Sequence, residues 1–342
     1  MKFSFLLGQL TDIGARKSIA PFIFNSTGIS PNCAKLSTIR SNKNILCPCF
    51  LVSSQDAATV IATNLSVCSS VLFVDIEKKI EFLSFNGQLQ LGNIFSNVHE
   101  LDLPCEVYPV KANDITVDAI YAHIVSFFGD IAGLNIGVIG ASNIGVKISQ
   151  RLVESGTFVN LFSRDYDHAT SVCSFINQSK SSFTLASASS VTAVDSLFYF
   201  ADCVIFSGDS KVALSEFAVN CILRTPAKTR LLLQVGHNIF SDREVSLISD
   251  ADPFLLQRLD ISTEILRFAE SYLHIRRKSA AIASLLASKS VYASHGFTPS
   301  SVVNASIVND VGDPLALIRA SKLSDAEYRS FDFHSGELEF DV

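Results

Sequence analysis

A glycine-containing segment near the middle of the chain limits the folds that this sequence can adopt. Residues 135–145 (NIGVIGASNIG) form an apolar run with several β-branched residues that breaks into small residues. β-Branched residues favour a buried strand, and small residues at the following turn expose backbone N–H groups at a helix N-terminus, where phosphate groups bind well. The segment therefore predicts a strand, a turn and a helix that bind a dinucleotide.

The turn departs at one position from the pattern G-x-G-x-x-G of dinucleotide-binding proteins. Ser142 stands where the second glycine lets the backbone approach the pyrophosphate, and its small side chain and hydroxyl make it a mild replacement. The alternative interpretation is an ordinary strand-to-helix connection in an α/β domain. The residues predicted to contact the diphosphate are Gly140, Ala141, Ser142, Asn143, Ile144 and Gly145.

The residues after the turn have the periodicity of a helix. Ile144, Ile148 and Leu152 recur at four-residue spacing and give one apolar face to a helix over residues 143–155. Gly156 is suited to the C-terminal cap of that helix. These flanking residues favour the dinucleotide-binding interpretation over the ordinary connection.

The end of the next predicted strand selects the cofactor. Residues 158–162 predict this strand, and Ser163, Arg164 and Asp165 follow it. An acidic residue here would bind the ribose hydroxyls of NAD, whereas an arginine can pair with the 2′-phosphate of NADP. Ser163 and Arg164 therefore favour NADP, and the alternatives are a solvated arginine or an acidic role for Asp165.

Two further apolar segments extend the same domain. Residues 203–208 and 230–236 predict buried strands, each of which ends in glycine. Ligands of open α/β sheets bind at the carboxyl ends of the strands. This rule adds Ser207, Gly208 and Gly236 to the predicted cofactor contacts.

Together the segments predict an α/β fold of two lobes, one of them a Rossmann-type, doubly wound parallel-sheet domain that binds NAD(P). The predicted parts are an N-terminal α/β substrate lobe at residues 1–114, the Rossmann domain at 115–258, and a C-terminal helical segment at 259–342 that returns to the first lobe and ends in an acidic tail.

Composition excludes several other classes. A length of 342 residues suffices for two domains with their own cores. A net charge of −6 and a pI of about 5.6 argue against a partner that is a nucleic acid. The mean hydropathy is positive, yet no uninterrupted apolar run reaches the roughly 18 residues of a membrane span. We therefore expect a soluble protein.

The cysteines lack the spacing of a metal site. The sequence holds no Cys-x-x-Cys pair and no cluster of histidines, so we expect no metal and thiols that are reduced and mostly buried. The apolar residues 3–7 are too few for the core of a signal peptide, and we expect a cytoplasmic location. The eight cysteines are Cys33, Cys47, Cys49, Cys68, Cys105, Cys173, Cys203 and Cys221.

Several separated segments occur in an order and at a rough spacing that resemble one enzyme family. They are residues 7–11 (LGQLT), the glycine turn with Ser163 and Arg164, residues 201–205 (ADCVI), residues 259–265 (LDISTEI) and residues 293–297 (ASHGF). The sequence resembles the cyanobacterial long-chain acyl-[acyl-carrier-protein] reductases over most of residues 1–297. The resemblance implies NADPH as the cofactor.

The same resemblance exposes a departure. In that family an acylated cysteine is discharged by hydride to give an aldehyde. The resemblance places this cysteine where Ala281 stands, and no cysteine follows Cys221. Ser279 or Ser284 could in principle be acylated, but no evident base flanks either of them. Either the chemistry differs or the chain is a non-catalytic relative.

The resemblance also implies partners. An acyl carrier protein is acidic, and the basic residues Arg267, Arg276, Arg277 and Lys278 could attract it electrostatically. The other expected partner is a small-molecule substrate, and the sequence also allows a homo-oligomer.

A second resemblance competes with the first. The order of Asn113 and Asp114, a helix, the glycine turn and then Ser163 and Arg164 is similar to two-lobed shikimate dehydrogenases and methylene-tetrahydrofolate dehydrogenases. Those enzymes need no covalent nucleophile and use a lysine near a carboxylate or hydroxyl as acid or base. This resemblance implies hydride transfer without an acyl-enzyme.

Three residues are candidates for that acid–base chemistry. Lys111 has Asp114 three residues after it and Tyr108 three residues before it. His237 directly follows a predicted buried strand, where it could contact substrate or transfer a proton. The alternatives are a solvated loop lysine and a histidine that is only hydrogen-bonded at a strand end. The predicted catalytic residues are therefore Lys111, Asp114 and His237.

The sequence thus predicts an NADP-dependent oxidoreductase whose substrate it does not name. A second interpretation is an NAD(P)-binding pseudoenzyme or regulatory protein, which the missing cysteine favours. A third is a scaffold protein that binds no dinucleotide, which the serine at position 142 favours slightly.

Overall fold

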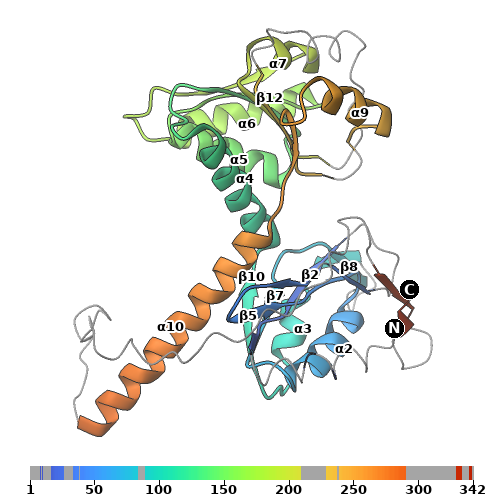
Figure 1. Cartoon of the computed structure of the whole chain (residues 1–342), viewed down its shortest axis with the longest axis vertical. Helices are drawn as coiled ribbons and strands as arrows, with labels where there is room; N and C mark the ends of the chain where they lie inside the picture. The colour runs from blue at the N-terminus through green and yellow to red at the C-terminus, as the bar shows by residue number, and fades with distance from the viewer. Residues whose placement is uncertain are drawn as a thin grey trace. The chain divides into compact units, whose positions relative to one another are not determined.

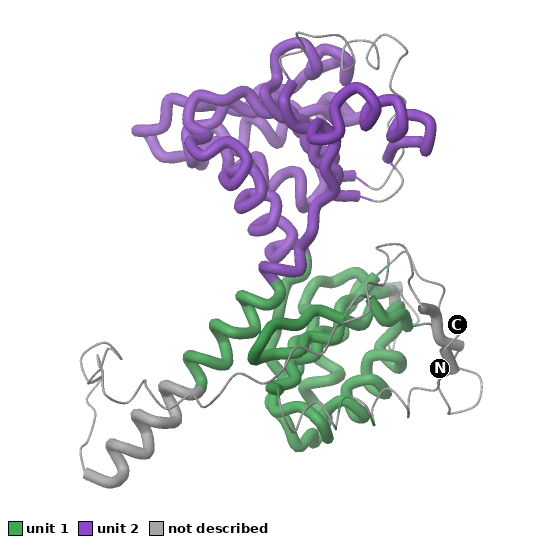
Figure 2. The backbone as a smooth tube through the Cα atoms, viewed as in Figure 1, with its two compact units in different colours: residues 1–112, 265–342 green, residues 113–264 purple. Residues whose placement is uncertain are grey.

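The computed structural model describes residues 8, 10, 17–26, 34–37, 39–83, 89–208, 229–236, 239–289, 329–332 and 339–340. For residues 81–83, 89, 277–289 and the last two ranges it describes the backbone alone. The chain divides into two compact units (Figure 2). Unit 1 combines Met1–Ala112 with Ile265–Val342, and unit 2 is Asn113–Glu264.

Unit 2 is built on a six-stranded parallel sheet (Figure 1). In space the strands follow the order β13-β12-β11-β14-β15-β16, so the sheet grows outward in both directions from its first strand. This is the doubly wound order of a Rossmann-type domain, and it confirms the predicted fold class. The strands are β11 (Asn135–Ile139), β12 (Phe158–Phe162), β13 (Ala188–Val191), β14 (Cys203–Phe206), β15 (Leu231–Gln234) and β16 (Leu256–Arg258).

The two central strands are apolar on both faces. Ile136 and Val138 of β11 are fully buried, as is Ile205 of β14, which is the register partner of Val138. A parallel strand with helices on both sides has no solvent face, so its sequence is a continuous apolar run. This is why residues 135–139 and 203–206 could be recognised as strands.

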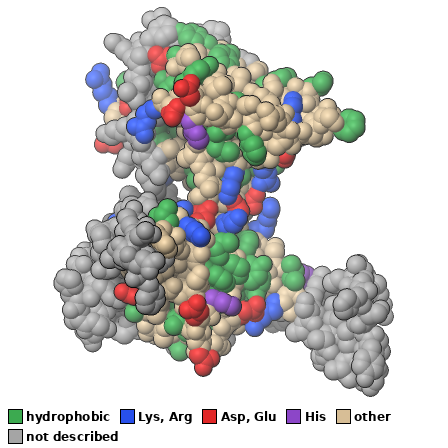
Figure 3. Space-filling model, turned by 180° about the vertical axis from the view of Figure 1, so that it is seen from behind, with side chains coloured by type: hydrophobic (Ala, Val, Ile, Leu, Met, Phe, Trp, Pro, Cys, Tyr) green, Lys and Arg blue, Asp and Glu red, His purple; other side chains and the backbone are tan. Residues whose placement is uncertain are grey.

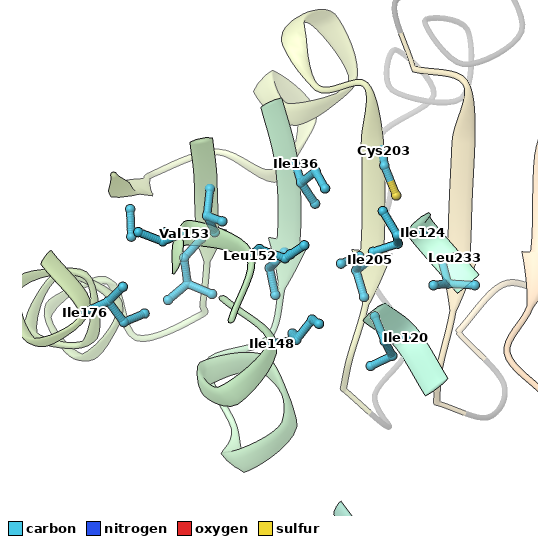
Figure 4. Close-up of a cluster of buried hydrophobic side chains, with 14 of the residues drawn as sticks. Ile120, Ile124, Ile136, Ile148, Leu152, Val153, Ile176, Cys203, Ile205 and Leu233 are labelled. Atoms are coloured by element: carbon cyan, nitrogen blue, oxygen red, sulfur yellow. The ribbon is translucent and has the colours of Figure 1, made fainter. Parts of the chain in front are cut away.

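Helices cover both faces of this sheet. On one face α4, α5 and α6 enclose an aliphatic cluster, in which Ile120, Ile148 and Ile176 meet the strands (Figure 4). On the other face α7 and α9 enclose a cluster with Phe198 and Ile248. The helices are α4 (Ala112–Phe128), α5 (Asn143–Glu154), α6 (Tyr166–Ser179), α7 (Val194–Phe200) and α9 (Asp242–Ala251).

Unit 1 contains a mixed sheet in the order β10-β7-β2-β6-β3-β17-β18, whose first four strands are parallel. Helices α2 (Gln55–Ser66) and α3 (Phe95–His99) pack on it. The strands of this sheet are β2 (Phe22–Asn25), β3 (Ala34–Leu36), β6 (Cys49–Val52), β7 (Val71–Asp75), β10 (Glu106–Val110), β17 (Arg329–Asp332) and β18 (Glu339–Phe340). Two smaller sheets pair β1 (Ser18–Ile19), β5 (Ile45–Cys47) and β4 (Arg40–Ser41), and β8 (Ile80–Leu83) with β9 (Leu89–Gly92).

The long helix α10 (Ser262–Lys289) packs on the unit 1 sheet through aromatic side chains. The ring centroid of Phe268 lies 5.4 Å from that of Phe73, and Tyr272 lies 4.3 Å from Tyr108. Arg276 adds an ion pair to Glu106 at 3.2 Å. Since successive side chains of a strand point to opposite faces, Phe73 faces α10 while its neighbours Leu72 and Val74 face the core with α2 and α3.

Apolar side chains also reach the surface of both units (Figure 3). The most exposed of those described are Phe183 and Leu185, which are 94% and 91% exposed. Both lie in the loop between α6 and β13. Among the described helices none is long and apolar enough to cross a membrane.

The aliphatic core of unit 2 leads to a stability prediction. We expect Leu152→Ala to lower the free energy of unfolding of unit 2 by about 2–5 kcal/mol, because this side chain is fully buried on α5 and its loss leaves a cavity. Phe183→Ala is the control, with an expected change within about 0.5 kcal/mol because its ring is exposed. Urea unfolding followed by circular dichroism measures both, and equal losses would contradict this packing.

Candidate functional site

The turn after β11 requires glycine at its first position. Gly140 has a φ of +108°, in the region that L-residues with a side chain rarely adopt. A Cβ atom at this position would also lie 3.0 Å from Ser207 Oγ and 3.3 Å from Gly208 N. The backbone of the turn therefore lies directly against the residues that end β14.

The turn requires glycine at its last position because the helix packs so closely on the strand. A Cβ atom on Gly145 would lie 1.9 Å from the carbonyl oxygen of Gly140 and 2.8 Å from Ser207 Oγ. Only a residue without a side chain can bring the first turn of α5 this close to the end of β11. The third glycine of the dinucleotide-binding pattern has this role.

Ser207 ties the carboxyl ends of the two central strands together. Its hydroxyl lies within hydrogen-bonding distance of two carbonyl oxygens of the turn segment, 3.0 Å from that of Ile139 and 3.1 Å from that of Gly140. Its backbone N–H also donates to Ile139 O at 3.0 Å. The structure thus brings Ser207 and Gly208 beside the glycine turn, at the point where the strand order reverses and ligands bind in folds of this kind.

The N-terminus of α5 is open to solvent. Ser142 occupies the N-cap position and is exposed, as is Asn143, while Ile144 packs against the core. The hydroxyl of Ser142 makes no capping hydrogen bond to the helix. The first N–H groups of a helix have no partner within the helix and carry a partial positive charge. This end of α5 can therefore accept an anionic group such as a phosphate.

A histidine that the sequence analysis missed supports the turn from α6. His168 Nε2 lies 3.1 Å from the carbonyl oxygen of Ala141 and can donate a hydrogen bond to it. The signal available in the sequence was the position of His168 in the first turn of α6, directly after β12. This bond links the glycine turn to the first turn of α6.

At the end of β12 the three polar residues take different roles. Asp165 caps α6, because its carboxylate accepts a hydrogen bond from His168 N at 3.0 Å. Ser163 Oγ accepts one from Asp165 N at 3.3 Å. Arg164 is exposed and has no hydrogen bond or ion pair with the side chains that the structure describes. Arg164 is thus available for an anion, whereas the acidic side chain is already engaged.

Gly236 lies at the same edge of the sheet. It is buried, and its backbone N–H lies 3.4 Å from the carbonyl oxygen of Phe206, the last residue of β14. The Gln234 side chain donates to its carbonyl oxygen at 3.0 Å. His237, predicted as a catalytic residue, lies outside the described residues.

The predicted pair of Lys111 and Asp114 falls on two units of the chain. Lys111 belongs to unit 1 and is exposed, directly after the last residue of β10. Asp114 belongs to unit 2, where its carboxylate forms an ion pair with Lys147 of α5. A parallel ion pair joins Asp118 to Arg151 one turn further along the two helices. The carboxylate of Asp114 is therefore engaged in an ion pair between α4 and α5.

A buried carboxylate lies close to Lys111 along the sheet, and the sequence analysis missed it. Asp75 ends β7 and is the register partner of Val110, the residue before Lys111. The Asp75 side chain is fully buried, and this burial raises its pKa to about 6 although the Glu77 backbone N–H and Lys79 act to lower it. The available signal was the carboxylate that ends the apolar run of residues 71–74.

The thiols described in the structure are poor nucleophiles. Burial raises the pKa of each of them, to about 11 for Cys105 and Cys173. A thiol reacts as the thiolate, so a raised pKa reduces its reactivity at neutral pH. The described thiols, none of which is in a disulfide, are Cys47, Cys49, Cys68, Cys105, Cys173 and Cys203. Ala281, at the position expected for the nucleophile, lies in α10.

Comparisons with known proteins show likeness of fold alone. No protein-family model matches the sequence, and no curated protein sequence is significantly similar to it. Among solved structures, L-tryptophan dehydrogenase from Nostoc punctiforme is 10% identical, with 72% of this chain and 71% of that chain aligned and a TM-score of 0.38.

Other similar structures have different activities. Glutamyl-tRNA reductase from Methanopyrus kandleri is 12% identical, aligns over 51% of this chain and 41% of that chain, and gives a TM-score of 0.37. The catalytic subunit of M. jannaschii aspartate transcarbamoylase is 7% identical, aligns over 77% and 94%, and gives 0.42. At these scores no activity follows from the likeness, and the Rossmann-type assignment rests on the strand order itself.

The buried carboxyl of Asp75 leads to a prediction about pH. Its pKa rises from 3.8 to about 6, so the folded state favours the protonated form. The resulting stabilisation is complete below about pH 4 and is lost as the pH rises through about 6, by at most about 3 kcal/mol. Asp75→Asn mimics the neutral form and lacks this dependence. Between pH 4 and pH 7 the free energy of unfolding of the wild type should therefore fall relative to that of Asp75→Asn.

Denaturant unfolding of both proteins at several pH values measures this difference. Asp102→Asn, an exposed aspartate of unit 1, is the matched control and should follow the wild type at every pH. Parallel profiles for the wild type and Asp75→Asn would contradict a buried carboxyl with a raised pKa.

Proposed function

We propose that this protein is an NADP-dependent oxidoreductase. The observation that carries the proposal is the glycine turn at the switch point of the unit 2 sheet, where Gly145 lets α5 approach β11 and leaves the helix N-terminus open. An open helix N-terminus beside two strand ends is suited to a diphosphate. When bound there, a nicotinamide cofactor supplies or accepts a hydride.

The turn residues would hold the cofactor through the backbone. The N–H groups of Ser142 and Asn143 would donate to the diphosphate, and the Ser142 hydroxyl could add a further hydrogen bond since it does not cap the helix. Ser207, Gly208 and Gly236 line the same edge from β14 and β15. These groups support binding of a nucleotide although Ser142 replaces the second glycine of the G-x-G-x-x-G pattern.

The choice of NADP over NAD is proposed from the end of β12. Arg164 is exposed there, and a guanidinium can pair with the 2′-phosphate in a bidentate geometry. Asp165, the residue that could bind ribose hydroxyls instead, is engaged in capping α6. Ser163 offers a second polar group beside Arg164.

Lys111 and His237 remain the proposed acid–base residues for a substrate that is a small molecule of unidentified class. Lys111 is exposed, so its side chain is accessible to a substrate. Asp114 is the weakest of the three proposed residues because Lys147 engages its carboxylate. Its proposed role is therefore limited to positioning α4 against α5.

A second candidate function is binding of the cofactor without turnover. Ala281 cannot form the acyl-enzyme of the acyl-[acyl-carrier-protein] reductases that the sequence resembles, and burial raises the pKa of the thiols described in the structure. We also propose a distant relation to those reductases, with an acyl carrier protein or a second copy of the chain as partner and a cytoplasmic location. Arg276, one of the basic residues that would attract a carrier protein, already pairs with Glu106.

The cofactor proposal predicts a selective loss of affinity. Arg164→Ala should weaken NADPH binding by about 1.5–3 kcal/mol, roughly 10- to 150-fold, and leave NADH binding nearly unchanged, because only NADPH carries the 2′-phosphate. Gly145→Ala should weaken both cofactors, since its Cβ atom displaces the turn. The measurement is the fluorescence of the reduced nicotinamide on titration with protein.

Arg243→Ala is the matched control, because this arginine is also exposed in unit 2 but lies on α9. It should bind NADPH as the wild type does. Equal losses of NADPH and NADH in Arg164→Ala would remove the assignment of Arg164. Undiminished binding in a folded Gly145→Ala variant would remove the glycine turn as the cofactor site.

The missing nucleophile predicts the absence of a covalent intermediate. After incubation with a long-chain acyl thioester, intact-protein mass spectrometry should detect no acyl adduct, and no aldehyde should form with NADPH, because Ala281 has no thiol. Ala281→Cys is the companion variant, and an adduct on that cysteine would support the resemblance. A stable adduct on the wild type would show that another residue has replaced the cysteine.

A further inference from the structure

The carboxyl edge of the unit 1 sheet contains a group of buried polar side chains that the proposed cofactor site does not use. Asn25 ends β2, Asp75 ends the neighbouring strand β7, and Glu77 and Lys79 lie on the segment between β7 and β8. The side chains of Asp75 and Glu77 are 0% and 9% exposed, and Asn25 is 5% exposed. Carboxylates this deeply buried need partners.

Three donors in this group, the Lys79 ammonium, the Glu77 backbone N–H and the Asn25 amide, satisfy only some of its oxygen atoms. Lys79 Nζ forms an ion pair with Glu77 Oε2 and lies 4.0 Å from Asp75 Oδ2. The Glu77 backbone N–H donates to Asp75 Oδ1 at 3.0 Å. The Asn25 amide donates to the Glu77 carbonyl oxygen at 2.5 Å, which turns its carboxamide toward the two acidic residues.

Four buried oxygens of this group accept no hydrogen bond in the described structure, and one of them, Glu77 Oε2, has the ion pair with Lys79 instead. The other three are Asn25 Oδ1, Asp75 Oδ2 and Glu77 Oε1. An unpaired buried acceptor is unfavourable, and three in one group are rarer still. Among the described residues, the group therefore offers three acceptors that further N–H or O–H donors could satisfy.

The charge of the group limits that molecule to a cation. The formal charges of Asp75, Glu77 and Lys79 sum to −1, which disfavours an anion. A divalent metal ion such as Ca²⁺ or Mg²⁺ needs about six oxygen ligands. No cluster of three metal-ligating side chains occurs among the described residues. A primary ammonium group carries one positive charge and three N–H donors.

We propose that this edge of unit 1 binds the primary ammonium group of a small molecule, whose three N–H groups donate to Asn25 Oδ1, Asp75 Oδ2 and Glu77 Oε1. The inference concerns unit 1 alone and does not rest on the proposed cofactor site. It would give the chain a substrate or effector that is a primary amine or amino acid.

The test compares two organic cations that differ in their N–H groups. Isothermal titration calorimetry of the whole chain at pH 7.5 should detect binding of ethylammonium chloride. Tetramethylammonium chloride and potassium chloride should bind at least tenfold more weakly, because neither cation can donate a hydrogen bond. Absence of ethylammonium binding, or equal binding of the three salts, overturns the proposal.

Variants locate the binding. Asp75→Asn and Glu77→Gln each remove one negative charge at nearly constant shape, and each should weaken ethylammonium binding at least tenfold. Asp102→Asn, an exposed aspartate on the segment before β10, should bind as the wild type does. If Asp75→Asn is not folded by circular dichroism, Glu77→Gln decides. Wild-type affinity in the folded variants overturns the site, whereas NADPH titration tests the cofactor proposal separately.

Discussion

The contact between the start of α5 and the end of β11 is the constraint on which unit 2 depends. Gly145 lies over the carbonyl of Gly140 at a separation that no Cβ atom permits, and Ser207 joins both to the end of β14. This contact fixes where α5 leaves the sheet, and the N-terminus of α5 beside it is exposed and has no side-chain cap. The packing of α5 on β11 and the proposed phosphate site at the start of α5 thus both involve the glycine turn.

A second set of contacts holds the helices that cover this region. The Asp114–Lys147 and Asp118–Arg151 ion pairs join α4 to α5, and the two helices share the aliphatic core under the sheet. Ion pairs with this much exposure contribute little to stability by themselves. Burial of Ile120, Ile124 and Leu152 stabilises the unit more than the ion pairs do, so the charges serve mainly to align two helices that the core already holds.

The sequence was sufficient for the features that depend on local pattern. The apolar run at residues 135–139 and the spacing of Ile144, Ile148 and Leu152 predict a strand and a helix because neighbours along the chain supply the whole signal. The Asp114–Lys147 pair joins two helices, and Asn25 reaches the segment with Asp75 and Glu77 from another strand, so no short window of sequence contains these partners together. Burial of a carboxylate likewise depends on the neighbouring strands, which the run at residues 71–75 does not reveal.

Unit 1 is assembled from both ends of the chain, with unit 2 inserted between Ala112 and Ile265. During synthesis the strands with Phe22, Phe73 and Tyr108 therefore emerge long before the helix residues Phe268 and Tyr272 that cover them. Until then one face of the sheet presents aromatic rings to solvent, whereas unit 2 already has all of its own elements. We therefore expect unit 2 to complete its fold before unit 1 does as the chain is synthesised.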